Sequence, residues 1–252
     1  MIQLKKGIKI LIGAILVLGV ATYAVYAAII ASNPSPEDRC THIELNIEQN
    51  PHSGFITNEI IENELHKANI YPKERLLADI RTRDIEKTLM KNEFIEQVEC
   101  YKTANNTVTI NIKQRTPVIY VLPNNGKGYY IDKYGKIITK TNYPVNLPVA
   151  TGIMSEAYAT KCLSKLGAYI VNDEFWNSQI EQIYVKANAD REYVIDLIPR
   201  VGNHVIHLGH ITNFENKLHR LMVFYEKALS QIGWNKYSSI DLEYEGQIIC
   251  KK

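Results

Sequence analysis

The chain has 252 residues, of which 46% are hydrophobic and 22% charged, which is the composition of a folded protein with a sizeable core. Its net charge is only +2, and three lysines near the N-terminus account for that excess. The remainder therefore lacks the basic field that a nucleic-acid-binding protein needs, and we exclude nucleic acid as a partner.

An uncharged apolar stretch from Ile10 to Ile30 follows Lys5, Lys6 and Lys9. At about 1.5 Å per residue, a helix of this length measures about 32 Å, enough to cross a hydrocarbon core of about 30 Å. No acidic residue precedes Glu37, so the positive-inside rule places the N-terminus in the cytoplasm. We predict a cytoplasmic tail at residues 1–9, a single transmembrane helix at 10–31, and all the rest outside.

A cleaved signal peptide is the alternative to this anchor, and it would release a soluble secreted protein. The apolar run is longer than the roughly 7 to 15 residues of a signal peptide. Val25-Tyr26-Ala27 is a tolerable but poor cleavage site, because signal peptidase favours small side chains at the first and third of these positions. The sequence favours a retained anchor.

A polar, proline-containing linker is expected at residues 32–39, followed by a first domain at 40–115. Alternating apolar residues predict strands at 43–48, 95–103 and 107–115. Two helices are expected between the first two strands, one capped by Thr57 and one capped near Thr82 and running to about residue 92. The order is strand, helix, helix, strand, strand.

The second domain, at residues 116–252, alternates short strands with two helices. A helix is expected at 155–171, and another begins at a Thr212-x-x-Glu215 capping box and stops at Gly233. The pattern predicts strands at 118–122, 128–132, 136–139, 180–187, 192–199, 204–209, 240–244 and 247–251. The fold class is α+β, with a mixed, mostly antiparallel β domain and flanking helices.

Four cysteines occur far apart in the sequence, at Cys40, Cys100, Cys162 and Cys250. Without a Cys-x-x-Cys pair, neither a zinc site nor a thioredoxin-type redox site is indicated. The sequence is compatible both with disulfide bonds between these cysteines and with four buried thiols.

No catalytic motif is present: the sequence lacks a nucleophile elbow, a Walker loop, His-Glu-x-x-His and a dinucleotide-binding glycine pattern. His204, His207 and His210 are three residues apart, so on a strand neighbouring members of the set point to opposite faces. Asp241 and Glu243 fit the solvated face of an amphipathic strand better than a catalytic pair. We predict a protein that is not an enzyme, with no catalytic, cofactor-binding or metal-binding residues.

Several motifs occur in a fixed order along the chain: Asn92-x-Phe94-Ile-x-x-Val98, the hairpin that ends with Ile112, Arg115-x-Pro117, Tyr130-Ile-Asp132-x-x-Gly135-Lys136, Leu208-Gly209 and Ile240-Asp-Leu-x-Tyr244. Taken together, they resemble the FtsQ/DivIB family of bacterial division proteins. The likeness covers nearly the whole chain and implies a POTRA domain followed by the family's β-rich domain. This chain departs from the family at Gln114, His210 and Glu243, where relatives often carry Glu, Arg and Arg.

The resemblance implies a non-enzymatic scaffold in the cytoplasmic (inner) membrane at the division septum. Such a scaffold would recruit and link divisome components, binding FtsB/DivIC-like and FtsL-like bitopic proteins by β-strand addition to its outer domains. A POTRA-containing secretion or outer-membrane assembly subunit is the alternative, and a secreted cell-wall enzyme comes third.

Strand addition requires an exposed sheet edge, and the last strand is our first candidate for it. The expected partner-binding residues are Tyr244, Gly246, Gln247, Ile248, Ile249 and Cys250. The strand at 95–103 is a second candidate, because other POTRA domains capture peptides on an edge.

Overall fold

The computed structural model describes residues 6–32, 37–48, 55–103, 105–124, 126–139 and 146–252. Within the first of these ranges, side chains are described for residues 13–28 only. Helix α1 spans Lys6–Ser32. In the part of the chain that is described, no helix combines the length and apolar character of a membrane span. The predicted anchor is thus not confirmed and stays a prediction, and most of the predicted linker lies outside the described residues.

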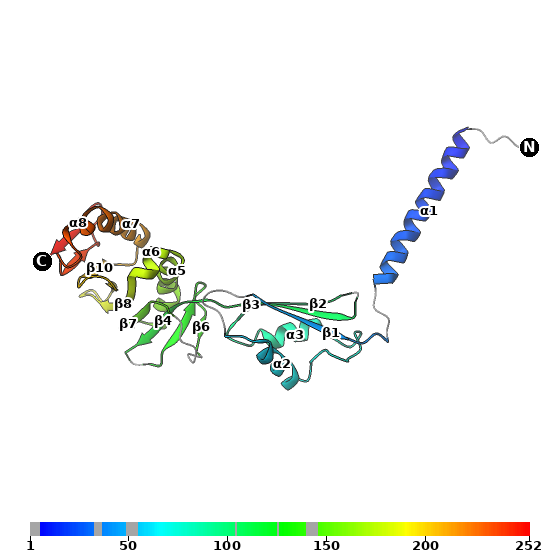
Figure 1. The fold of residues 1–252 in the computed structure, drawn as a ribbon, viewed down its shortest axis with the longest axis horizontal. Coiled ribbons are helices and arrows are strands. Elements are labelled where there is room, and N and C mark those ends of the chain that lie inside the picture. The colour runs from blue at the N-terminus through cyan, green and yellow to red at the C-terminus, as the bar shows by residue number, and fades with distance from the viewer. Residues whose placement is uncertain (1–5, 33–36, 49–54, 104, 125, 140–145) are drawn as a thin grey trace, which may run out of the picture. The chain divides into compact units, whose positions relative to one another are not determined.

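The chain divides into two compact units, the first of which contains the predicted strand–helix–helix–strand–strand order. Its elements are β1 (His42–Glu48), α2 (Asn58–Lys67), α3 (Thr82–Leu89), β2 (Ile95–Lys102) and β3 (Thr107–Gln114). The strands form a sheet in the order β1-β3-β2, with β1 parallel to β3. Helices α2 and α3 lie together on one face of it (Figure 1).

Of the two helix caps predicted for the first unit, one is formed and the other is not. Thr57 caps α2 as predicted, because its hydroxyl accepts a hydrogen bond from the Ile60 amide. Thr82 does not cap α3: it is the first helical residue, and Arg81 holds the cap position without a side-chain bond. Ile61, Leu65, Ile85 and Leu89 are buried, as their helical spacing predicts.

The second unit is built on a nine-stranded sheet in the order β12-β11-β10-β9-β8-β7-β4-β5-β6. Neighbouring strands are antiparallel except for β4–β7, β7–β8 and β10–β11, so the predicted mixed sheet is confirmed. The strands are β4 (Pro117–Pro123), β5 (Tyr129–Asp132), β6 (Ile137–Ile138), β7 (Val149–Gly152), β8 (Ile180–Ala187), β9 (Tyr193–Pro199), β10 (Val205–Gly209), β11 (Ser239–Asp241) and β12 (Ile249–Lys251).

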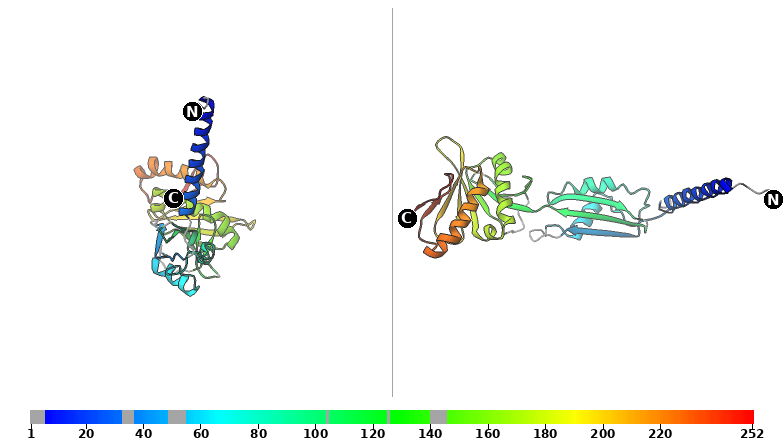
Figure 2. Two further views of the ribbon diagram at one scale, coloured as in Figure 1. Left: turned by 90° about the vertical axis from the view of Figure 1, so that its right-hand side faces the viewer. Right: turned by 90° about the horizontal axis from the view of Figure 1, so that it is seen from above.

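Helices connect β7 to β8 and β10 to β11, two of the three parallel pairs, and cover the core of this unit. They are α4 (Glu156–Tyr158), α5 (Ser164–Asn172), α6 (Glu174–Gln179), α7 (Phe214–Phe224) and α8 (Ser230–Ile232). π-helical turns at Ala159–Leu163 and Tyr225–Leu229 interrupt the two long helices that the sequence predicts. Their buried residues form one core with the sheet, in which Trp176 and Tyr225 are the largest fully buried side chains. Helix α7 (orange) runs beside the C-terminal strands (Figure 2).

Some local predictions for the second unit are wrong, and two of its elements give no signal in the sequence. The capping box is not formed, because α7 starts one residue later, after Asn213 in a left-handed conformation with φ 61°. The strand expected at 240–244 is shorter, because Glu243 donates its amide to Asp241 Oδ1 at 2.9 Å and turns the chain. The sequence analysis does not predict strand β7 or helix α6.

Candidate partner-binding site

The last strand of the chain is an edge strand. β12 ends the nine-stranded sheet and pairs only with β11 among the described strands, through Ser239–Lys251, Ile240–Cys250 and Asp241–Ile249. It is shorter than the predicted 247–251 strand, so Gln247 and Ile248 lead into it rather than belong to it. The free edge of β12 is what strand addition requires.

The six predicted partner-binding residues do not share one surface. Tyr244 and Ile249 are 55% and 40% exposed, and Gly246, with φ 71°, makes the turn between them. Ile248 and Cys250 instead pack against the hydrophobic core, and burial raises the pKa of the Cys250 thiol. The surface open to a partner is therefore the exposed turn with Gln247 and Ile249 beyond it.

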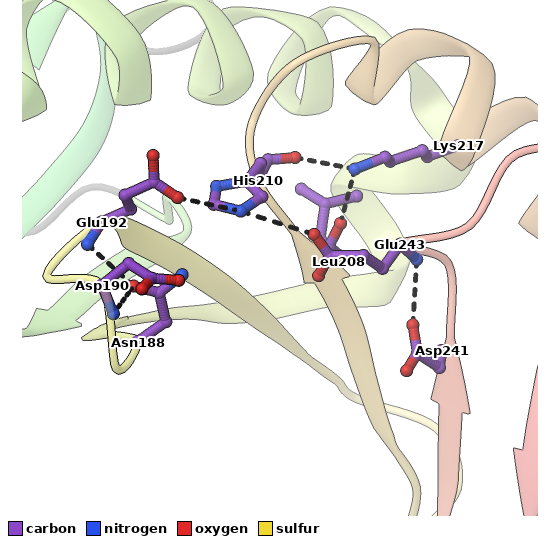
Figure 3. A network of polar contacts seen from close by, with 8 residues as sticks. All are labelled: Asn188, Asp190, Glu192, Leu208, His210, Lys217, Asp241 and Glu243. Atoms are coloured by element: carbon purple, nitrogen blue, oxygen red, sulfur yellow. Dashed lines mark hydrogen bonds and ion pairs between the residues drawn. The ribbon is translucent and has the colours of Figure 1, made fainter.

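Helix α7 holds the backbone next to this edge with two cationic side chains. Lys217 Nζ donates to the carbonyls of Leu208 at 2.9 Å and of His210 at 2.8 Å, at the end of β10 (Figure 3). Arg220 donates to the carbonyls of Leu242 at 2.9 Å and of Tyr244 at 2.8 Å. Burial lowers the pKa of Lys217, while the nearby Glu243 carboxylate acts in the opposite direction.

His210 and Glu243, two of the residues at which the sequence differs from the pattern of the family it resembles, contact each other. His210 Nε2 lies 3.6 Å from Glu243 and 3.5 Å from Glu192, between the two carboxylates (Figure 3). Gly209 has φ 69°, a left-handed conformation that favours glycine, so the backbone accounts for the glycine of the Leu208-Gly209 motif; a Cβ atom there would also meet the Glu243 carboxylate, which is the mobile end of its side chain. His210 and Glu243, together with Lys217 and Arg220, line a pocket of about 610 Å³ beside the turn at Gly246.

The second candidate edge, β2, is partly occupied. Glu86 of α3 accepts a hydrogen bond from the Cys100 amide at 2.9 Å, although Cys100 lies in this edge strand. Lys102, two residues on, donates to the carbonyl of Leu77. A partner strand would have to displace the Glu86 contact, so the geometry favours β12.

The three spaced histidines have separate partners. His204 is buried against Tyr225, with Nε2 2.6 Å from the hydroxyl, whereas His207 Nδ1 lies 2.8 Å from Asp196, which also binds Lys186 at 2.5 Å. Within the described ranges, no three His, Cys, Asp or Glu side chains converge as metal ligands would. The four cysteines are unpaired.

A buried ion pair joins two of the motifs that carry the family resemblance. Arg115 pairs with Asp132, and their side chains are 12% and 2% exposed. Arg115 also donates to the carbonyls of Glu93 at 3.1 Å and Ile95 at 3.0 Å, while Asp132 accepts the amides of Tyr134 and Lys136 at 2.9 Å and 2.7 Å. The arginine and the aspartate therefore fix the start of the β-rich unit.

Sequence reasoning missed Lys217, Arg220 and Glu192. A signal for Lys217 existed, because it lies between Phe214 and Leu218 on the buried stripe of α7, where a lysine must bind acceptors. Arg220 lies three residues further on, on the same face. Glu192 gave no signal, since its contact with His210 depends on how β9 and β10 pair.

Comparisons with known proteins agree with the motifs. A family model described as FtsQ/DivIB, C-terminal related, matches residues 116–251, and a POTRA-like domain model matches residues 38–113. The cell division protein FtsQ of Geotalea daltonii is 27% identical, over 99% of this chain and 88% of that protein. The cell division protein FtsQ of Geobacter sp. (strain M21) is 26% identical, over 82% of this chain and 74% of its own length. Since the family model covers more than half of the residues, the chain belongs to the FtsQ/DivIB family.

Proposed function

We propose that this protein is a non-enzymatic scaffold that recruits and links divisome components at the septum. Its family consists of cell division proteins, which supports a role in division. The observation that carries the scaffold mechanism is the free edge of β12, with an exposed Tyr244 on the turn before it. The same matches favour this function over a secretion subunit or a secreted cell-wall enzyme.

The proposed partners are small bitopic division proteins of the FtsB/DivIC and FtsL types. One of them would add a strand to β12, so that backbone hydrogen bonds supply affinity and neighbouring side chains supply specificity. Tyr244 and Ile249 offer the exposed apolar surface that partner side chains would cover.

The proposed location is the cytoplasmic membrane, with the N-terminus inside and a single anchor at residues 10–31. We also propose the domain limits 40–115 and 116–252 for the outer part. The charge-free run between Lys9 and Glu37 supports the anchor, and the extents of the two matching family models support the domain limits.

Ile248→Pro tests strand addition. Proline removes a backbone donor and disfavours strand pairing, so the variant should capture the FtsB/DivIC-like protein at least about tenfold more weakly, in pull-down from detergent-solubilised membranes. Ile248→Val is the matched control, because it keeps the amide and a β-branched side chain. Equal capture by the proline variant and the wild type would refute binding at this edge.

A further inference from the structure

Arg220 connects α7 to the turn that leads into the edge strand. Its two Nη atoms donate to carbonyls two residues apart, those of Leu242 at 2.9 Å and Tyr244 at 2.8 Å. Within the described parts of the chain, no carboxylate lies within ion-pair distance of the guanidinium, and Nε is buried without a partner. The side chain is therefore committed to these two backbone acceptors.

The turn has few other contacts: the Glu243 amide donates to Asp241 Oδ1 at 2.9 Å, and the Glu243 carboxylate lies 3.6 Å from His210 Nε2. Leu242 is buried, and its amide donates to the His207 carbonyl at 2.9 Å, which continues the parallel pairing of β10 and β11. After Leu242 the backbone leaves the sheet, and Tyr244, Glu245, Gly246 and Gln247 are all exposed. β12 then returns to pair with β11 over three residues. The position of the Tyr244 carbonyl thus determines where the returning strand begins.

Lys217, one turn earlier on α7, binds the backbone at the end of β10, the strand that pairs with β11. It binds the carbonyls of Leu208 and His210, where β10 ends. Both cations lie on one face of α7, because residues three apart in a helix are neighbours. Bonds from a charged donor to neutral acceptors are stronger than neutral hydrogen bonds, so α7 fixes the ends of two parallel strands through side-chain to backbone bonds.

We propose that Arg220 is the positioning residue of the partner-binding edge. By binding the Leu242 and Tyr244 carbonyls it holds the turn in the one conformation that aligns β12 with β11 and leaves the outer side of β12 open. This inference rests on the proposed function, since it assigns a role at the same edge. Arg220 itself does not contact the partner strand; it acts through the turn.

Hydrogen exchange on the full-length protein tests the positioning role without a partner. In Arg220→Met, which keeps the apolar stem but removes both bonds, those amides of residues 249–251 that are bonded to β11 should exchange about tenfold faster or more. The amides of β8 and β9 should keep their wild-type rates, because the central strands do not depend on the turn. Arg220→Lys retains one donor group, so its exchange rates should lie between those of the wild type and those of Arg220→Met.

Capture of the FtsB/DivIC-like protein provides the second readout. Arg220→Met should weaken capture by about tenfold, and Arg220→Lys should restore part of it. His219→Met is the matched control, because His219 is the exposed neighbour on the same helix; it should change neither readout.

Unchanged exchange at residues 249–251 in Arg220→Met would overturn the proposal. Equal acceleration in β8 and β9 would also overturn it, because Arg220 would then be a general stabiliser. If Ile248→Pro abolishes capture while Arg220→Met binds normally, strand addition stands and the positioning role fails. If Ile248→Pro leaves capture unchanged, the proposed function fails. The predicted effect of Arg220 on partner capture then fails as well.

Discussion

At the scale of single residues, the Arg115–Asp132 pair should dominate the stability of the β-rich unit. Removing one partner of a buried ion pair leaves the other charge buried without compensation, which typically costs about 3 to 5 kcal/mol. Asp132→Ala also removes the acceptor of the Tyr134 and Lys136 amides. We expect the variant to lose about that much free energy of unfolding, in urea titrations followed by tryptophan fluorescence.

This fluorescence reports on the β-rich unit alone, because both tryptophans of the chain, Trp176 and Trp234, lie in it. Glu192→Ala is a suitable control, since it removes a contact to His210 from a glutamate that is 62% exposed. Exposed pairs contribute about 0 to 1 kcal/mol. Equal losses in the two variants would contradict a special role for the buried pair.

His204 makes the stability of this unit depend on pH. Burial lowers the pKa of His204 below its usual value of 6.5, so the unfolded chain takes up a proton at a higher pH than the folded protein does. The contribution is fully present above about pH 6.5 and is lost as the pH falls below it, by at most about 1.4 kcal/mol per pH unit.

His204→Gln should therefore lose less stability than the wild type between pH 7.5 and pH 5. Glutamine does not titrate, and it can still hydrogen-bond the Tyr225 hydroxyl, which His204 Nε2 approaches at 2.6 Å. Unfolding midpoints at several pH values, compared for the two proteins, measure the difference. Parallel pH profiles would assign the dependence to other groups.

At the scale of secondary-structure elements, the sequence predicts best where buried and exposed residues alternate. β8 begins and ends at the predicted residues: Ile183 and Val185 face the core while Tyr184 points away from it, although a register shift after Ile180 interrupts the alternation at the start of the strand. β7 has only four residues, Val149–Gly152, without polar alternation, and so gives no such signal. The edge position of β12 depends on the order of the strands, which periodicity does not encode.

The start of α7 illustrates a local signal that the tertiary structure does not use. Thr212 lies in a turn, and Asn213 takes the cap position in a left-handed conformation that asparagine tolerates better than alanine. Asn213→Ala should cost about 1 to 2 kcal/mol of unfolding free energy. Thr212→Ala should stay within about 0.5 kcal/mol. If the same urea titrations showed a larger loss of unfolding free energy for Thr212→Ala than for Asn213→Ala, Thr212 would be the residue that caps α7.

At the scale of the whole molecule, the proposed anchor should act only as a tether. Binding through β12 uses the outer part of the chain, and an anchor would keep that edge near the membrane from which bitopic partners emerge. Replacing residues 1–31 with an unrelated single-pass helix that also carries lysines on its cytoplasmic side should therefore restore division in depleted cells. Cell length and septum counts measure the rescue.

A chain that starts at residue 32 and is exported without an anchor is the control and should leave long, undivided filaments. If the exported chain divides cells normally, tethering is dispensable; if the exchanged helix fails at equal abundance, the native helix itself contacts a partner.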